Sequence, residues 1–108
     1  MSQPHNINAL LATVQKLSGP ENYFDWVFQM HLILTHVGVW GIVNGLMDWP
    51  AVTDTEGLAD WTAKSADGYM AIGLALRVDQ VIHIHDCTDT PSAWSALEHI
   101  YLRNSLAN

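Results

Sequence analysis

Residues 22–38, with the sequence NYFDWVFQMHLILTHVG, decide the fold class of this chain. Apolar side chains recur there at steps of three and four residues, the spacing that places side chains on one face of an α-helix. These positions are Tyr23, Trp26, Val27, Met30, Leu34 and Val37. A Gly-Pro pair at positions 19–20 precedes the stretch, Glu21 and Asn22 open it, and Gly38 ends it. We therefore predict a helix that begins near residue 21 and ends before Gly38.

Two large apolar side chains of this helix do not fit its main stripe. At 100° per residue, Phe28 and Leu32 lie about 140° and 180° around the helix from Tyr23, close to its polar edge. A helix that is apolar nearly all round is either buried on several sides or carries a contact surface.

The segments that follow predict two more helices and a loop. Residues 39–43 (VWGIV) indicate a short helix ended by Asn44, and residues 46–57 indicate a loop. A long helix is expected over residues 58–76, with an inward stripe of Leu58, Trp61, Ser65, Tyr69, Ile72 and Leu76. Small residues within it favour close approach of a neighbouring helix; they are Ala66, Gly68, Ala71, Gly73 and Ala75.

The C-terminal helix has the clearest start signal in the sequence. Thr90 is the expected N-cap and Pro91 the first helical residue, and Arg103 is expected in the last turn, where a cation suits the helix dipole. Its stripe is Ala93, Trp94, Leu97, Ile100 and Tyr101. Upstream of it, Asp79 is expected to cap a short turn through Val81 and Ile82.

These elements predict an all-α fold, a small single-domain bundle of about four to five helices. Strand signals are nearly absent apart from residues 81–85. Residues 1–20 are expected to form an N-terminal arm, either a short helix or an extended segment laid against the domain, and residues 21–108 the helical domain.

The amino-acid composition argues against a disordered chain, a nucleic-acid-binding protein and a membrane-spanning protein. The 108 residues are 49% hydrophobic and 14% charged, which indicates a packed globule rather than a disordered chain. The net charge of −7 and only four Lys and Arg residues, all far apart, argue against direct nucleic-acid binding. No apolar stretch reaches the length of a membrane span, and no signal peptide opens the sequence, so we expect a cytoplasmic location.

The histidine-rich segment 83–87 (HIHDC) is the sharpest candidate for metal chemistry. On a strand, His83, His85 and Cys87 would face one side as three zinc ligands, with a fourth from His31 or His99. A turn with solvent-exposed histidines and a small packed cysteine explains the same residues and is favoured, so we expect no metal and no cofactor.

No catalytic arrangement stands out, and we expect no enzyme. Cys87, the only cysteine, lacks the surrounding sequence of a thiol nucleophile. The carboxylates of Asp48, Asp54, Glu56 and Asp60 are spread over a loop and a helix start, as in a solvated surface.

Three apolar residues are candidates for self-association. Phe28 and Leu32 lie off the main stripe of their helix, and Leu102 lies off the stripe of the last helix. Exposed apolar side chains that lie together mark contact surfaces. The alternative is that other parts of the fold cover all three residues.

Two blocks of residues resemble the copia-type LTR-retrotransposon Gag proteins. The first is Lys16-Leu17-Ser18-Gly19, Asn22-Tyr23-Phe24, Trp26, Phe28-Gln29-Met30 and Leu34, with Val39-Trp40 where the family's first helix ends. The second is Trp61, Ala71-Ile72, Leu74, Leu76, Ile84, Asp86-Cys87, Thr90, Ala93-Trp94, Leu97 and Tyr101. Together they span nearly the whole chain from Lys16 onward.

The sequence also departs from this family's pattern. Pro91-Ser92 stands where a Lys-Glu pair is common, and the third-helix region has few lysines. A second capsid lobe and an RNA-binding zinc knuckle do not fit after Tyr101, so we expect an N-terminal lobe, a fragment or a shortened derivative of Gag.

The resemblance implies a structural capsid subunit whose copies self-associate into virus-like particles around the element's RNA. The implied partner is the protein itself, with neither nucleic acid nor membrane bound by this acidic domain. The alternative is a Gag-derived module, reused by a host, with a hydrophobic groove that binds a peptide or protein ligand. The arm at residues 7–14 is a candidate to fill this groove in the free protein.

Overall fold

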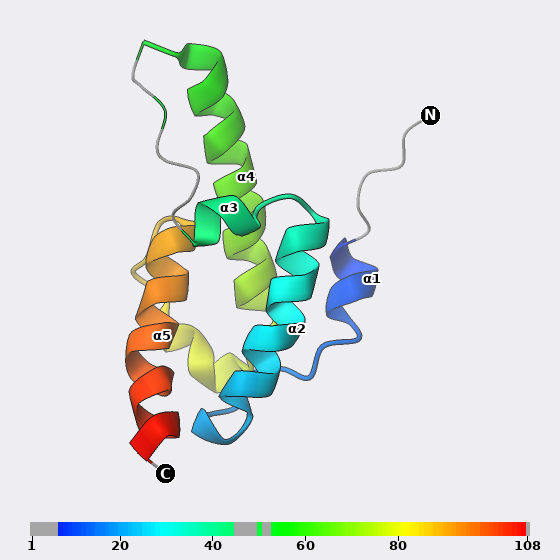
Figure 1. The fold of residues 1–108 in the computed structure, drawn as a ribbon, viewed down its shortest axis with the longest axis vertical. Helices are drawn as coiled ribbons and strands as arrows, with labels where there is room; N and C mark the ends of the chain where they lie inside the picture. Colours follow the sequence, from blue (N-terminus) through cyan, green and yellow to red (C-terminus); the bar gives the residue numbers. More distant parts are fainter. Residues whose placement is uncertain (1–6, 45–49, 51–52, 108) are drawn as a thin grey trace.

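The computed structural model describes residues 7–44, 50 and 53–107, and they form an all-α fold (Figure 1). The described part of the chain contains no strand, and the predicted fold class is confirmed. In chain order the elements are α1 (Ile7–Leu11), the 3₁₀ helix η1 (Pro20–Asn22), α2 (Tyr23–His36), α3 (Trp40–Val43), α4 (Thr55–Leu74), the 3₁₀ helix η2 (Val78–His83) and α5 (Thr90–Ala107).

The α2 helix begins and ends where its sequence predicts. Val37 is its C-cap, and Gly38 follows with a φ of 84°. The N–H of Gly38 donates to the Thr35 carbonyl at 3.1 Å and that of Val39 to the Leu34 carbonyl at 2.9 Å. This pair of bonds is the Schellman motif, and it requires the positive φ that glycine adopts without steric cost.

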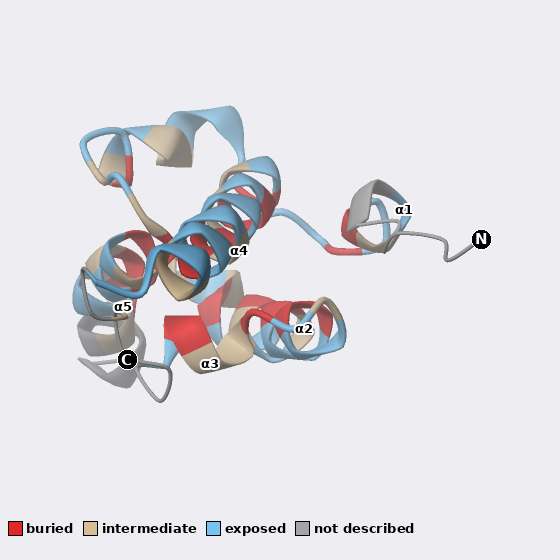
Figure 2. Cartoon of the chain, turned by 90° about the horizontal axis from the view of Figure 1, so that it is seen from above, coloured by how far each residue is buried: buried red, intermediate tan, exposed pale blue. Residues whose placement is uncertain are grey.

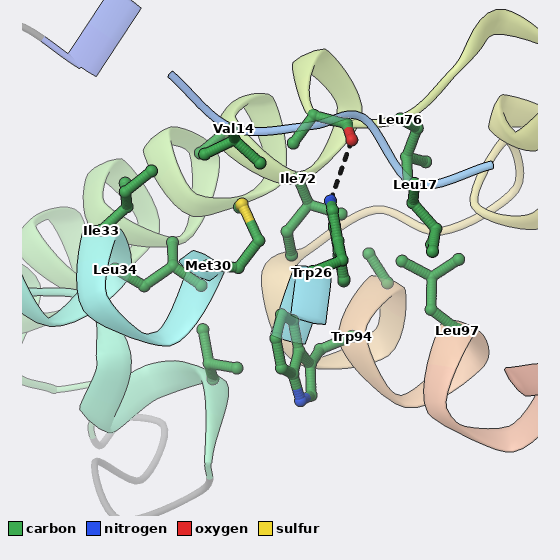
Figure 3. Packing of buried hydrophobic residues seen from close by; sticks show 14 of the residues in the cluster. Val14, Leu17, Trp26, Met30, Ile33, Leu34, Ile72, Leu76, Trp94 and Leu97 are labelled. Atoms are coloured by element: carbon green, nitrogen blue, oxygen red, sulfur yellow. Dashed lines mark hydrogen bonds between the residues drawn. The ribbon is translucent and has the colours of Figure 1, made fainter. Parts of the chain in front are cut away.

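The core lies between α2, α4 and α5, and α3 bridges the ends of α2 and α5 (Figures 1 and 2). Figure 2 shows buried residues on the sides of these helices that face one another. Figure 3 shows Trp26, Met30 and Leu34 of α2 beside Ile72 of α4 and Leu97 of α5. All of these side chains are almost completely buried. The predicted inward stripes of the three long helices therefore meet in one core, except that Leu58 and Trp61, at the start of the α4 stripe, lie outside the core cluster.

The N-terminal arm combines both predicted forms. The α1 helix packs on α2 and α4. A turn follows over residues 12–14, and the chain then reaches Leu17, which forms an isolated parallel bridge with Leu76. Leu11, Val14 and Leu17 are buried in the core cluster. Residues 1–6 lie outside the described residues, and the boundary between arm and domain at residue 20 stays a prediction.

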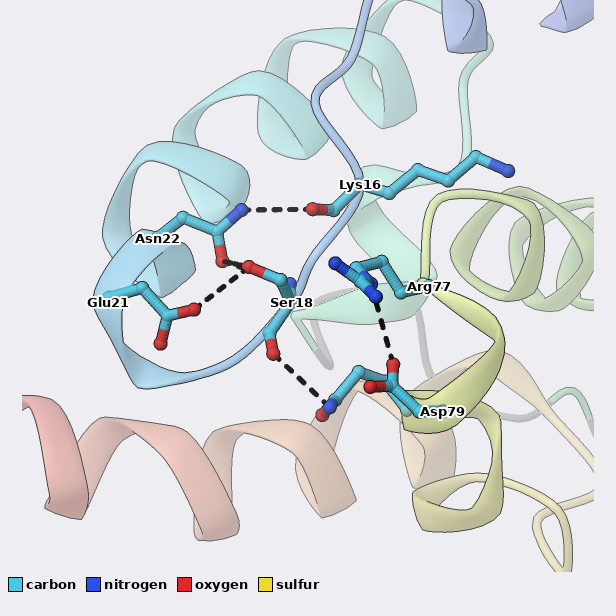
Figure 4. Close-up of polar contacts among 7 residues, drawn as sticks. Lys16, Ser18, Glu21, Asn22, Arg77 and Asp79 are labelled. Atoms are coloured by element: carbon cyan, nitrogen blue, oxygen red, sulfur yellow. Dashed lines mark hydrogen bonds and ion pairs between the residues drawn. The ribbon is translucent and has the colours of Figure 1, made fainter.

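A polar network holds the arm to the start of α2 (Figure 4). The Asn22 side chain donates to the Lys16 carbonyl at 2.9 Å and accepts the Ser18 N–H at 3.0 Å. The Ser18 hydroxyl donates to the Glu21 carboxylate at 3.0 Å. The Lys-Leu-Ser-Gly and Asn-Tyr motifs of the sequence thus meet at this junction, which gives their spacing a structural reason.

Several predicted caps and boundaries are wrong. The long helix begins at Thr55 rather than near Leu58, because Asp54 caps it by accepting the Gly57 N–H at 2.9 Å. Asp79 caps no turn: its carboxylate lies 3.7 Å from Nε of Arg77, and no side chain caps η2. The last helix continues to Ala107, so Arg103 precedes its last turn.

The start of α5 shows why the predicted Thr90 cap is wrong. The Asp89 carboxylate accepts the Ser92 N–H at 2.9 Å, which makes Asp89 the N-cap. Thr90 is buried against α4 instead, where its N–H donates to the Ser65 hydroxyl at 3.0 Å and its hydroxyl donates to the Ser65 carbonyl. The Thr90 hydroxyl, which we expected to cap α5, therefore bonds to α4 instead.

Close approach of α4 and α5 takes place at Gly68. A Cβ added there would lie 2.5 Å from the Thr90 hydroxyl oxygen and 2.9 Å from its Cγ2. The prediction that small residues admit a neighbouring helix is therefore confirmed at this position.

Candidate functional site: an apolar helix face and an aromatic cleft

Three large apolar side chains form an exposed stripe along α2. Phe24, Phe28 and Leu32 are 51%, 63% and 56% exposed. Their spacing of four residues places them on one side of the helix, which we call the α2 face. The prediction that Phe28 and Leu32 lie outside the buried stripe is confirmed. Phe24 was missed, although its distance of four residues from Phe28 is the signal that identifies it.

The exposure of the α2 face follows from the contacts of the opposite side. Trp26, Met30 and Leu34 are buried against α4, α5 and the arm, so the helix cannot also bury Phe24, Phe28 and Leu32. Exposed polar residues, including Asp25, Thr35 and His36, flank the stripe. An apolar centre with a polar rim is the composition of protein–protein contact surfaces.

The other predicted self-association residue lies elsewhere. Leu102 is on α5, half-buried, and packs against the core cluster. The fold therefore covers Leu102 in part, whereas Phe28 and Leu32 lie exposed on another helix.

Exposed apolar side chains also occur as a pair on η2. Val78 and Ile82 are 89% and 75% exposed and, like Phe28 and Leu32, are four residues apart. They lie on a short 3₁₀ helix rather than on a long α-helix. This η2 pair provides a comparison for the α2 face in the experiments below.

A cleft of about 350 Å³ opens between α2, α3 and α5. Its lining residues are Tyr23, Val27, Trp40, Val43, Asn44, Pro91, Trp94, Ser95 and Glu98. The rings of Trp40 and Trp94 are perpendicular, at 88°, with centroids 5.5 Å apart. His31 stacks on Trp40 at 4.2 Å between centroids, and Trp26 stacks on Trp94 at 5.6 Å. Neighbouring side chains therefore fix the orientation of both indoles.

Glu98 gives this cleft a negative charge. It is exposed on α5 and, among the described residues that line the cleft, it is the only Asp, Glu, Lys, Arg or His. Burial and the Glu98 carboxylate together raise the pKa of Tyr23 to about 12. Burial is the larger of the two causes, and the negative charge of Glu98 adds to it.

The described part of the arm lines none of this cleft. The α1 helix packs on α2 and α4, whereas the cleft lies between α2, α3 and α5. Residues 7–14, which we expected to fill a ligand groove, therefore do not fill this cleft.

The histidine-rich segment does not assemble a metal site. His83 packs edge-to-face on Tyr101 at 5.7 Å, His85 lies 3.3 Å from the Asp86 carboxylate, and Cys87 packs half-buried against the core. His31 and His99 belong to other helices. Within residues 7–44, 50 and 53–107, no group of three or more His, Cys, Asp or Glu side chains is placed to hold a metal ion.

Two of the four predicted surface carboxylates, Asp54 and Asp60, have structural roles. Asp54 caps α4, and Asp60 pairs with Lys64 at 3.2 Å across one helical turn. Glu56 is exposed in the first turn of α4, and Asp48 lies outside the described residues.

None of the helices in the described part of the chain combines the length and the apolar character that a membrane span needs.

Comparison with known proteins identifies one family. The family model for the gag-polypeptide of LTR copia-type matches residues 30–108, which is most of the chain. No curated protein and no solved structure matches significantly. The matched region includes the second half of α2, from Met30 onward, and every later element.

Proposed function

Since the chain belongs to the copia-type Gag family, whose role is structural, we propose that it is the N-terminal lobe of a capsid subunit that self-associates through the α2 face. In this proposal, copies of the subunit assemble into a particle shell around the element's RNA in the cytoplasm. The observation that carries the proposal is the exposed line of Phe24, Phe28 and Leu32.

The chemistry of the α2 face suits weak and repeated contacts. Moving a large apolar side chain out of water stabilises a complex by about 1.5–3 kcal/mol when burial is complete. Three side chains per copy, each already partly covered, supply less than this maximum and must offset the entropy lost on association. Individually weak contacts repeated with symmetry are what assembly of a closed shell requires.

The simplest arrangement pairs the α2 face with the same face of a second copy. A two-fold contact uses one self-complementary patch, and it is the commonest symmetry among soluble oligomers. Phe28 is the middle residue of the stripe, so it is the natural residue to lie nearest the two-fold axis.

The negative charge of the domain supports the assignment of RNA binding to another segment of Gag. With a net charge of −7 and four scattered Lys and Arg residues, this lobe repels phosphate groups. We therefore assign RNA binding in the particle to a segment other than this domain.

The proposal is tested by sedimentation velocity at protein concentrations from micromolar to millimolar. The test variant is Phe28→Ser/Leu32→Ser, and its matched control is Val78→Ser/Ile82→Ser on η2, which removes two more exposed apolar side chains at the same spacing. We expect the wild type and the control to associate equally, and the test variant to associate at least about tenfold more weakly.

The helical circular-dichroism spectrum of each variant reports whether the fold is kept. Equal association by the two variants contradicts the assignment to the α2 face. A wild type that stays monomeric over the whole concentration range contradicts self-association by this lobe.

The aromatic cleft favours a second candidate function, that of a Gag-derived interaction module. It is a concave site with mostly apolar walls and a few polar groups, as peptide and small-ligand sites are. Titration with peptides distinguishes this function from self-association, because the cleft and the α2 face are formed by different residues.

A further inference from the structure

The cleft between α2, α3 and α5 has the components of a cation site. Its aromatic walls come from Trp40 and Trp94, set at right angles, and from Tyr23. The face of an aromatic ring carries partial negative charge and attracts a cation within about 6 Å of its centroid, with tryptophan the strongest.

The carboxylate of Glu98 adds a full negative charge at the same place. Among the described residues, no Lys, Arg or His lines the cleft and none forms a salt bridge with Glu98. Lys64 and Arg77 pair with Asp60 and Asp79 instead. The charge of Glu98 is therefore not neutralised by a basic side chain of this part of the fold.

We propose that the cleft binds the arginine side chain of a peptide, with the guanidinium paired to Glu98 and packed against Trp40 and Trp94. This inference rests on the second candidate function, peptide binding, and is independent of self-association. Val27 and Pro91 line the same cleft and provide apolar contacts for the neighbouring parts of the peptide.

Arginine fits these walls better than lysine does. Its guanidinium is planar, stacks on indole rings and donates two parallel hydrogen bonds to one carboxylate. The lysine ammonium is a compact and strongly hydrated charge that loses more hydration on entering an apolar cleft. The net charge of −7 further favours the approach of a basic peptide.

The test follows the indole N–H signals of Trp40 and Trp94 by two-dimensional ¹⁵N NMR. The probe is an acetylated and amidated peptide, Gly-Ala-Arg-Ala-Gly. Two further peptides replace the arginine by citrulline, which is neutral and nearly the same shape, or by lysine. The protein variants are Glu98→Gln and the control Glu56→Gln, which changes the net charge equally on an exposed residue of α4.

We expect the arginine peptide to shift both indole signals, and the citrulline peptide to bind about tenfold more weakly because the charge-assisted hydrogen bonds are lost. Glu98→Gln is expected to weaken binding of the arginine peptide by a similar factor, and Glu56→Gln to leave it unchanged. The unshifted amide signals of the core report that each variant is folded.

Three results overturn the proposal in distinguishable ways. Equal binding of the citrulline and arginine peptides preserves peptide binding but excludes recognition of the cation. If no peptide shifts the indole signals, peptide binding and recognition of the cation are both excluded. Shifts of the Trp40 and Trp94 signals that depend on protein concentration alone identify a second copy of the chain as the occupant instead.

Discussion

The indole Nε1 of Trp26 donates a 2.9 Å hydrogen bond to the carbonyl oxygen of Ala75, which is 49 residues further along the chain. The same oxygen accepts the N–H of Leu17 at 2.9 Å. One carbonyl at the end of α4 thus joins α2 and the N-terminal arm, and Figure 3 shows the indole at the centre of the core.

Replacement of this indole tests how much the core depends on it. Trp26→Phe is expected to lower the free energy of unfolding by about 1–3 kcal/mol, since it leaves a cavity and removes one hydrogen bond. Urea unfolding measures the loss, and Trp40→Phe, at a half-buried position, provides the comparison. A loss for Trp26→Phe no larger than that for Trp40→Phe would contradict the central place of Trp26.

Two glycines of α4 are expected to respond to alanine with opposite signs. Gly68→Ala places a Cβ 2.5 Å from the Thr90 hydroxyl oxygen, so helix α5 must shift, and we expect destabilisation by about 1–3 kcal/mol. At Gly73 the nearest atom to an added Cβ is Ile84 Cδ1, at 3.9 Å, so Gly73→Ala is expected to stabilise by up to about 1 kcal/mol. Thermal unfolding of both variants provides the measurement, and equal changes in Tm would refute the close crossing at Gly68.

The N-cap of α5 is tested at Asp89. Asp89→Ala is expected to cost about 1 kcal/mol, because the Ser92 N–H loses its acceptor and the helix dipole loses a favourable charge. Asp86→Ala is the control, since the Asp86 side chain is fully exposed and pairs with the neighbouring His85. If urea unfolding gives the same midpoint for both variants, Asp89 is not the cap.

The raised pKa of Tyr23 predicts a loss of stability in alkali. In the unfolded chain the phenol ionises near pH 10, whereas in the folded chain its pKa is about 12. The folded state therefore holds the proton more tightly, so the stabilisation is complete below pH 10 and is lost as the pH rises toward 12. We expect the urea midpoint to fall between pH 10 and 12, and to fall less in Tyr23→Phe. An identical decline in both proteins would show that Tyr23 is not the cause.

The helices were largely predictable because their signals are local. The three- and four-residue steps from Tyr23 to Leu34 and from Ala93 to Tyr101 identify α2 and α5, and Gly38 ends α2 as expected. These features depend on backbone geometry within a few residues, which is what a single sequence encodes most directly.

Features that depend on neighbouring elements were not predictable in the same way. Asp89 and Thr90 both suit an N-cap, and only the contact with Ser65 of α4 decides between them. Leu102 lies off the stripe of α5 but is half-buried through packing against the core. The cleft beside Trp40 and Glu98 requires three helices to meet at one place, which no local pattern specifies.

The most direct test of the central claim, that the α2 face joins copies of this Gag lobe, is a dilution series followed by two-dimensional ¹⁵N NMR. We predict that, as the protein is concentrated, signals shift or broaden at Phe24, Phe28, Leu32 and their exposed neighbours on α2, while those of the η2 pair Val78 and Ile82 stay fixed. Concentration-dependent changes at η2 or elsewhere with an unchanged α2, or spectra that do not depend on concentration, would contradict the claim.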